Sequence, residues 1–500
     1  MRRKLTPLFA ILIFSTVLSI WIVYNRILNF QDESFEKLLT LPQLPKPTTF
    51  MVNPLQIQDW VRKYNVTHLF DWTWHKNGDF KRCRTPAILS SQPPVRKFKL
   101  NSTTVVNDVV AYFQSHPDEG CIVDSVARLP TLVPHPVPRA RSLNDTCFSL
   151  HIEGWPLCNR SPMELSELIP AISRFVAIAV FKGYIDTGYC HPEVPGTIFT
   201  EHATIHFQTW TARCGNDGIY NIPRIKPKYQ HTELIDSIGT YLSAPGHFGP
   251  QQLPRLLRLL ATAPTTAKVL VSKGGVADLL VDVLVERGIV ARDRIIPYEA
   301  HKGSYHFASI VYRSETWPYV GNRPIPNHLH DRTDMQLVHR VLAGDEEQSI
   351  VKKDRIILIK RNKGRARSII EHSSLAVLIT SALKESNMTS NLHLEIFEAQ
   401  GHMRDHIALF RRARVIVGPH GAGMMNILWA SPGTYVVEIG YTTGMVFPQM
   451  YAEMSLHLDH KYWICKGYGD YAAPIHVDLN DFVYIINQIL QEIKIENQRS

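Results

Sequence analysis

Two patterns of apolar and polar positions alternate along the chain from about residue 200 onward. Apolar residues at three- and four-residue spacing predict helices at 250–260, 275–286, 332–342 and 481–495. Short runs rich in Val, Ile and Leu, or alternating with polar residues, predict strands at 203–209, 268–271, 294–296, 308–312, 355–360, 414–417 and 434–439. Strands that alternate with helices of about 10–15 residues are typical of parallel sheets covered on both faces.

A polar break at Gly344-Asp345-Glu346-Glu347-Gln348-Ser349 divides these elements into two sets. We therefore predict an α/β protein with two Rossmann-like, doubly wound domains that face a cleft, the architecture termed GT-B. The first domain would cover residues 56–345, with an irregular, cysteine-containing extension up to about residue 200, and the second would cover residues 346–500.

The first 55 residues carry the signs of a membrane anchor and a stem. A basic tail, residues 1–4, precedes an uncharged run at 5–24, which is long enough to cross a bilayer at about 1.5 Å per residue. The positive-inside rule then predicts a cytoplasmic tail and a lumenal body. A cleaved signal peptide is the alternative, but the run ends in Trp21-Ile22-Val23-Tyr24 rather than in small residues. Residues 25–55 are proline-rich in part and would form the stem.

Composition agrees with a lumenal globular body. The net charge is +9, but the basic residues are scattered and no nucleic-acid motif occurs, so we expect no nucleic-acid partner. The seven cysteines contain no C-x-x-C pair, which argues against zinc, and an oxidising compartment would allow up to three disulfides. Their connectivity stays open. Candidate N-glycosylation sequons begin at Asn65, Asn101, Asn144, Asn159 and Asn387, the fourth weakened by a following proline.

A glycine-rich turn, Gly418-Pro419-His420-Gly421-Ala422-Gly423, lies between the strand at 414–417 and a helix expected through 427–429. Unpaired backbone N–H groups and the helix dipole favour a phosphate at such a turn. Gly421 and Gly423 would admit the phosphate closely, and His420 would place an imidazole at the rim. The alternative is an ordinary strand-to-helix turn in which glycine supplies positive φ.

Charged residues follow the neighbouring predicted strands. Arg361, Lys363, Arg365 and Arg367 come after the strand at 355–360, where arginine forks would suit a diphosphate, although a solvated basic face is the alternative. Glu438, near the end of the strand at 434–439, would hold ribose hydroxyls, as acids do at this place in other doubly wound sheets.

Together these motifs resemble glycosyltransferase family sixty-one, which includes plant xylan arabinosyl- and xylosyltransferases and animal O-linked N-acetylglucosaminyltransferases. The shared signature is a strand with an R-x(4–5)-R tail, a G-x-H-G-A-G turn about 45 residues later, and a P-G before the next strand. Gly246-His247-Phe248 with Leu253-Pro254 matches a further family element, and the resemblance covers roughly residues 200–460. Met424-Met425 and Glu371 depart from the usual pattern and leave the donor sugar open.

The candidate site residues follow from these motifs. Donor binding is assigned to Arg361, Arg367, His420, Gly421, Ala422, Gly423 and Glu438. His247 is the candidate general base on the acceptor hydroxyl, with helix capping or substrate positioning as the alternative. No D-x-D motif occurs, so we expect no metal or other cofactor, and cations with helix-end amides would stabilise the leaving diphosphate. His328 and His330 form either a two-histidine metal pair or part of a surface loop.

We therefore expect a single-pass type II membrane enzyme of the Golgi or endoplasmic reticulum. It would transfer xylose, arabinose or N-acetylglucosamine, with inversion, from a UDP-sugar to a protein or polysaccharide hydroxyl. An inactive glycan-binding scaffold of the same fold is the first alternative. A lumenal sulfotransferase is the second, but a lysine-containing phosphate loop near an early strand is not seen.

Overall fold

The computed structural model describes residues 58–66, 69, 104–106, 112–113, 115–127, 131–133, 138–150, 169–185, 198–200, 202–205, 227–238, 245–298, 305–320, 323–324, 332–344, 351–445 and 447–499. The chain forms two units, Met1–Pro47 with Val320–Arg323, and Thr48–Tyr319 with Pro324–Ser500. The predicted tail, anchor and stem lie outside the described residues, as do Asn101, Asn159, His328 and His330.

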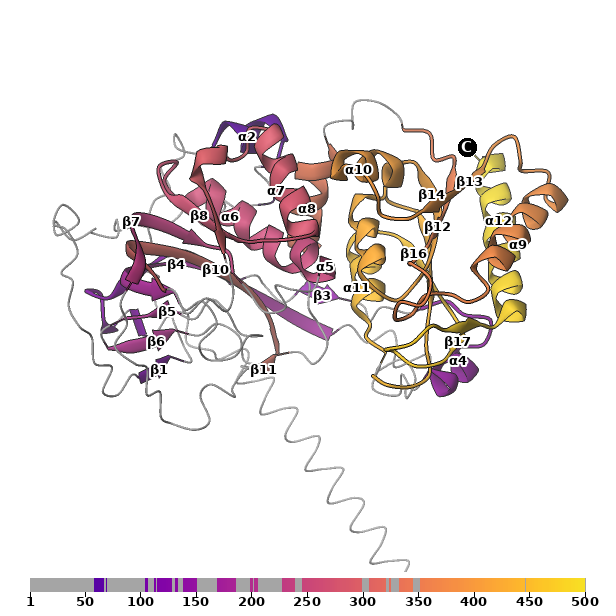
Figure 1. Ribbon diagram of the computed structural model, residues 1–500, viewed down its shortest axis with the longest axis horizontal. Coiled ribbons are helices and arrows are strands. Elements are labelled where there is room, and N and C mark those ends of the chain that lie inside the picture. Colours follow the sequence, from indigo (N-terminus) through magenta and orange to yellow (C-terminus); the bar gives the residue numbers. More distant parts are fainter. Residues whose placement is uncertain are drawn as a thin grey trace, which may run out of the picture. The chain divides into compact units, whose positions relative to one another are not determined.

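A five-stranded parallel sheet forms the centre of the carboxyl-terminal part (Figure 1). Its strands are β12 (Arg355–Ile359), β13 (His393–Phe397), β14 (Ala413–Pro419), β15 (Tyr435–Ile439) and β16 (Lys461–Cys465). Their spatial order is β13-β12-β14-β15-β16, so the chain winds first one way and then the other, and the reversal falls between β12 and β14. Ligands of doubly wound sheets bind beyond the carboxyl ends of the strands at such a reversal. The strands predicted at 355–360, 414–417 and 434–439 are confirmed.

Helices cover both faces of this sheet, which explains why its central strands β12, β14 and β15 are largely apolar runs. Figure 1 shows α9 (His372–Glu385) and α12 (Leu479–Arg499) on one face, and α10 (Met403–Arg411) and α11 (Met450–His457) on the other. The small antiparallel pair β17 (Gly467–Tyr468) and β18 (His476–Val477) follows β16. The predicted helix at 481–495 is confirmed as part of α12.

The amino-terminal part is built on an eleven-stranded sheet that is mixed rather than wholly parallel. Its long strand β4 (Ile169–Ile185) pairs antiparallel with β10 (Tyr305–Val320) and with three shorter strands. The predicted α/β class with parallel sheets is confirmed, whereas the extension before residue 200, which was expected to be irregular, adds antiparallel strands to the sheet. Sequence periodicity missed this pairing because most of the antiparallel strands lie before residue 200. The shorter strands are β1 (Thr104–Val106), β2 (Gly120–Ala127), β3 (Thr131–Val133), β5 (Ile198–Phe199), β6 (Ala203–Ile205) and β11 (Arg323–Pro324).

One side of the mixed sheet does have the predicted Rossmann-like character. Strands β7 (Pro227–Asp236), β8 (Lys268–Ser272), β9 (Ile295–Tyr298) and β10 run parallel in the order β10-β7-β8-β9. The crossover from β7 to β8 carries α5 (Pro245–His247), the π-helix η8 (Phe248–Gln252) and α6 (Leu253–Thr262). The remaining helices here are α2 (Asp59–Lys63), α7 (Val276–Glu286), η9 (Arg292–Arg294) and α8 (Arg332–Ala343).

A segment from the amino-terminal half also packs on the five-stranded sheet. Arg139 forms a parallel bridge with Trp463 of β16, and α4 (Leu143–Ser149) follows it. Leu150 lies against Gly440, where a Cβ would come within 2.6 Å of Leu150 Cδ1. Lys466 pairs with Asp145 at 2.5 Å. Residues 138–150 therefore pack on the carboxyl-terminal sheet, although all five strands of that sheet come after residue 350.

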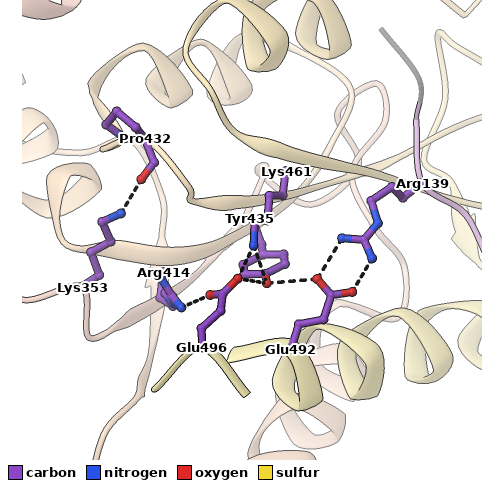
Figure 2. Close-up of polar contacts among 8 residues, drawn as sticks. All are labelled: Arg139, Lys353, Arg414, Pro432, Tyr435, Lys461, Glu492 and Glu496. Atoms are coloured by element: carbon purple, nitrogen blue, oxygen red, sulfur yellow. Dashed lines mark hydrogen bonds and ion pairs between the residues drawn. The ribbon is translucent and has the colours of Figure 1, made fainter. Parts of the chain in front are cut away.

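The amino edge of the same sheet carries a paired cluster of charges (Figure 2). Tyr435 Oη lies 3.0 Å from a carboxylate oxygen of both Glu492 and Glu496 of α12. Lys461 and Arg414 each pair with Glu496, and Arg139 pairs with Glu492. These contacts join the starts of three strands to the last helix.

The described residues include three of the cysteines and three of the sequon asparagines. Cys121 and Cys147 are disulfide-bonded, whereas Cys465 of β16 is a free, buried thiol. Asn65, Asn144 and Asn387 are exposed, as sequon asparagines must be. Among the described residues, no helix combines the length and apolarity required to cross a bilayer.

Candidate active site

The glycine-rich turn forms the floor of the candidate site. Strand β14 ends at Pro419, and a 3-10 helix, η11 (Ala422–Trp429), begins three residues later. Gly421 has φ of +147°, a backbone conformation that favours glycine. The expected α-helix is thus a 3-10 helix. Bonds at three-residue spacing support it, since the Asn426 amide donates to the Gly423 carbonyl and the Trp429 indole donates to Asn426.

Close packing fixes the turn on the neighbouring strand. A Cβ on Gly418 would lie 3.0 Å from Ile359 Cβ, and one on Gly423 would lie 2.8 Å from Ile359 Cγ2. The Gly421 carbonyl accepts a hydrogen bond of 2.7 Å from the Tyr451 hydroxyl of α11. Burial, and next the charge of Glu438, raises the pKa of Tyr451, so its hydroxyl stays protonated and remains a donor.

Arg361 reaches over this turn from the end of β12. A Cβ on Gly421 would lie 2.0 Å from Arg361 Nη1, so the guanidinium occupies the space that a side chain would need. Within the part of the chain that the structure describes, this guanidinium has neither a hydrogen-bond nor an ion-pair partner. Burial, and next the like charge of Arg367, lowers the pKa of Arg361. A half-buried cation with no acidic neighbour is a favourable place for an anionic ligand.

Arg367 has a different surrounding. Its Nε donates to the His420 carbonyl at 2.9 Å, its Nη1 donates to the Tyr471 carbonyl at 2.8 Å, and its guanidinium stacks 3.8 Å from the centre of the Tyr471 ring. Its backbone is left-handed, with φ of +58°. The sequence pattern predicted Arg367 only as a diphosphate ligand. In the structure its guanidinium also holds the turn in place through the bond to the His420 carbonyl.

His420 is anchored through one ring nitrogen. Its Nδ1 lies 2.6 Å from Glu438 Oε1, and the Tyr462 hydroxyl donates to Glu438 Oε2 at 2.5 Å. Nε2 has no hydrogen-bond partner among the described residues. The ring centre lies 5.3 to 5.9 Å from the ring centres of Phe447, Tyr451 and Tyr441. The imidazole is therefore held in one orientation.

Glu438 does not lie where a ribose could reach it. The residue is 0% exposed, and both carboxylate oxygens accept hydrogen bonds from neighbouring side chains. The geometry accordingly departs from the predicted role as a ribose ligand and makes Glu438 a partner of His420. The sequence pattern alone cannot reveal this role of Glu438, because a glutamate at a strand end has the same pattern whether its carboxylate is buried or exposed.

His247 is brought to the turn from the other sheet. A Cβ on Gly246 would lie 3.3 Å from Ala422 Cα, and one on Gly249 would lie 2.8 Å from Met425 Sδ, so α5 and η8 pack directly on η11. Burial lowers the pKa of His247, and the nearby His420 acts in the same direction. Two motifs separated by about 170 residues of sequence thus meet in one site. The π-helix immediately after His247 is a further sign of function, because such turns are frequent at functional sites.

Three tyrosines of the site were not predicted from the sequence. Tyr451, Tyr462 and Tyr471 are scattered beyond the turn and belong to no motif. Tyr462 had one detectable signal, since it adds a hydroxyl to the otherwise apolar middle of β16. The register pairs Val436 with Tyr462 and therefore puts Tyr462 on the same face of the sheet as Glu438.

The assembled site suits a phosphate-bearing ligand. A glycine turn, an unpaired arginine and an oriented imidazole meet at the reversal of strand order, as in α/β proteins that bind nucleotides. Residues 245–437 match the family model described as Glycosyltransferase 61. The resemblance to this family that the motifs predicted is confirmed over this segment. The comparison with curated proteins found no match.

Proposed function

We propose that the protein transfers a sugar from a UDP-linked donor to a hydroxyl of a protein or polysaccharide, with inversion at the anomeric carbon and without a metal. The observation that supports this most is the unpaired guanidinium of Arg361 over Gly421. The diphosphate of a donor brings two negative charges to this place. Negative charge on the leaving oxygen increases as its bond to the sugar breaks. A cation and backbone N–H groups that await this charge stabilise the transition state more than the ground state.

His247 is the proposed general base. It reaches the turn from α5, on the element opposite Arg361, and inversion needs the base and the leaving group on opposite sides of the sugar. Its lowered pKa keeps the imidazole neutral, and so able to accept a proton, at mildly acidic pH. The GT-B arrangement, with the acceptor on the amino-terminal part and the donor on the carboxyl-terminal part, is included in this proposal.

We further propose a type II topology in the Golgi or endoplasmic reticulum, with residues 5–24 as the anchor. The disulfide bonds of Cys121 and Cys147 favour an oxidising lumen, and exposed sequon residues such as Asn144 are compatible with it. Full-length protein from a secretory host should lose mass on treatment with an N-glycosidase. Unglycosylated, cytosolic full-length protein would overturn this topology.

The activity is tested with full-length protein in detergent and a panel of nucleotide sugars that includes UDP-xylose, UDP-arabinose and UDP-N-acetylglucosamine. We expect release of UDP from one of these donors, stimulated by a glycan or peptide acceptor. UDP binding without release or transfer from any donor would support the scaffold instead. Release of a nucleotide other than UDP would keep the enzyme and change the donor class.

A further inference from the structure

A fully buried acid, Glu438, lies near the candidate site. Glu438 is 0% exposed, yet it lies on β15 next to the turn that carries His420. Burying a carboxylate costs several kcal/mol unless its oxygens are hydrogen-bonded. Two side-chain donors, His420 and Tyr462, meet this requirement. Such an arrangement requires an explanation beyond packing, because an apolar residue would fill the same space without that cost.

The first consequence concerns the hydrogen on the imidazole. A carboxylate 2.6 Å from Nδ1 can only accept, so Nδ1 must carry a hydrogen and donate it. Nε2 is then the ring atom that remains for a ligand. The neutral ring offers a lone pair there, and the protonated ring offers an N–H. The carboxylate therefore selects which nitrogen meets the ligand.

Tyr462 fixes the carboxylate in turn. Its hydroxyl donates to Glu438 Oε2 at 2.5 Å, and the two residues lie on adjacent strands in a known register. Burial, and next the charge of Glu438, raises the pKa of Tyr462 well above its usual range, so the hydroxyl keeps its hydrogen. The carboxylate of Glu438 thus cannot turn toward another partner without losing this bond.

We propose that Tyr462 and Glu438 are positioning residues, which hold the His420 imidazole so that its Nε2–H donates to the diphosphate of the donor. This inference rests on the proposed function and deepens it. Arg361 would supply charge from one side of the turn, and His420 would supply a directed hydrogen bond. Glu438 balances the positive ring and keeps its orientation, as outer partners do for functional histidines elsewhere.

The proposal implies a dependence on pH, since only the protonated ring carries Nε2–H. Other charged or titratable groups around the ring contribute to its charge state. They are Glu438 on β15, Tyr441 after that strand, Tyr451 on α11, His247 on α5, and Arg361 and Arg367 after β12. Replacing Glu438 removes the one anion in this set, so the dependence of UDP binding on pH should change.

The test measures UDP affinity calorimetrically with full-length protein in detergent, from about pH 5.5 to about 8.5, which brackets imidazole titration. Glu438→Gln keeps the size of the side chain and removes its charge. We expect it to weaken UDP binding about 10- to 150-fold near neutral pH, the usual effect of losing a charge-assisted hydrogen bond. The dependence of UDP affinity on pH should also differ from that of the wild type. The titration of UDP itself is common to all variants and cancels.

Tyr462→Phe provides a second variant in case Glu438→Gln fails to fold. It should weaken UDP binding by a smaller factor than Glu438→Gln, because it removes one neutral donor that holds the carboxylate in place. Tyr435→Phe is the matched control at the opposite edge of the sheet. It also removes a tyrosine hydroxyl that contacts carboxylates, and it should leave UDP affinity and its pH dependence unchanged.

A double-mutant cycle separates positioning from general structural damage. If Glu438 acts through the imidazole, Glu438→Gln in a His420→Ala background should cause little further loss of UDP affinity. Additive losses would show an effect independent of His420 and would overturn the proposal. So would a folded Glu438→Gln or Tyr462→Phe whose UDP affinity and pH dependence equal those of the wild type. Failure of the wild type to bind UDP is a different result: it overturns the proposed UDP-sugar donor, and this inference with it.

Discussion

At the amino edge of the five-stranded sheet, Arg414 and Lys461 meet Glu496, and Arg139 meets Glu492 (Figure 2). At the carboxyl edge, Arg361 meets no acid in the described part of the chain, and Arg367 donates to two carbonyls. The same sheet therefore carries complete ion pairs at the starts of β14 and β16, and beyond the end of β12 it carries a cation without an ion-pair partner among the described residues. Charges that are paired within the protein contribute to its folding stability. A half-buried cation without a described ion-pair partner can instead pair with a bound ligand, and its charge then contributes to ligand affinity.

The largest expected effect lies on the element that faces the carboxyl edge. His247→Ala should slow sugar transfer about 10²- to 10⁴-fold, the usual contribution of a general base, with little change in UDP affinity. Because burial lowers the pKa of His247, the neutral base persists into mild acid. The wild-type rate should therefore hold as the pH falls to about 6.5, the usual value for histidine, and decline only below it. If His247→Ala abolished UDP binding while the fold stayed intact, His247 would belong to the donor site instead.

Replacing one arginine at each edge of the sheet is the most direct test of the difference between the two edges. Arg361→Ala should weaken UDP binding and slow transfer, each about 10- to 150-fold, because a charge-assisted hydrogen bond to the diphosphate is worth about 1.5–3 kcal/mol. Its thermal unfolding should change little, since the wild-type guanidinium has no described partner. Arg414→Ala should do the reverse, with a lower unfolding temperature and unchanged UDP affinity. Equal effects of the two changes on UDP affinity would contradict the distinction between the edges.

Arg367 should combine both behaviours. Arg367→Ala removes the brace under the His420 carbonyl and also a positive charge near the ligand, so UDP affinity and unfolding temperature should fall together. Arg367→Lys keeps the charge but cannot reproduce two directed bonds and the stacking on Tyr471. Affinity measurements on both variants divide the two roles. Full recovery of UDP affinity by the lysine variant would leave charge as the only contribution.

Tyr435→Phe should give a modest loss of stability without a functional effect. The hydroxyl lies between Glu492 and Glu496 and accepts from Lys461, so its removal leaves buried or half-buried groups with fewer partners. We expect the free energy of unfolding to fall by about 1–3 kcal/mol in urea titrations. A decrease in transfer rate larger than the decrease in folded protein would mean that the amino edge also shapes the site.

Removal of metal should have the smallest effect. The chain has no D-x-D motif, and Arg361 with the glycine turn can stabilise the leaving diphosphate. Transfer measured after dialysis against EDTA should therefore equal transfer in untreated samples. A complete loss that Mn²⁺ restores would require a metal site assembled from residues distant in sequence.

Local periodicity predicted the parallel sheet and the turn well, because β12, β14 and β15 are buried on both faces and read as continuous apolar runs. It failed for β4 and its antiparallel partners, whose pairing depends on residues far apart in the chain. The motifs brought His247 and His420 into one site. The role of Glu438 could not be predicted, since it depends on Tyr462 covering the carboxylate from the next strand.

The free thiol of Cys465 offers a way to time the opening of this sheet. Its side chain is 0% exposed in β16, the strand between β15 and the bridged Arg139 segment. A thiol reagent can reach it only when the strand opens, so the labelling rate reports the free energy of that opening. A ligand that binds only the closed sheet should slow labelling in proportion to its occupancy. The labelling rate of this buried thiol thus provides a binding assay, even for a ligand that is never turned over.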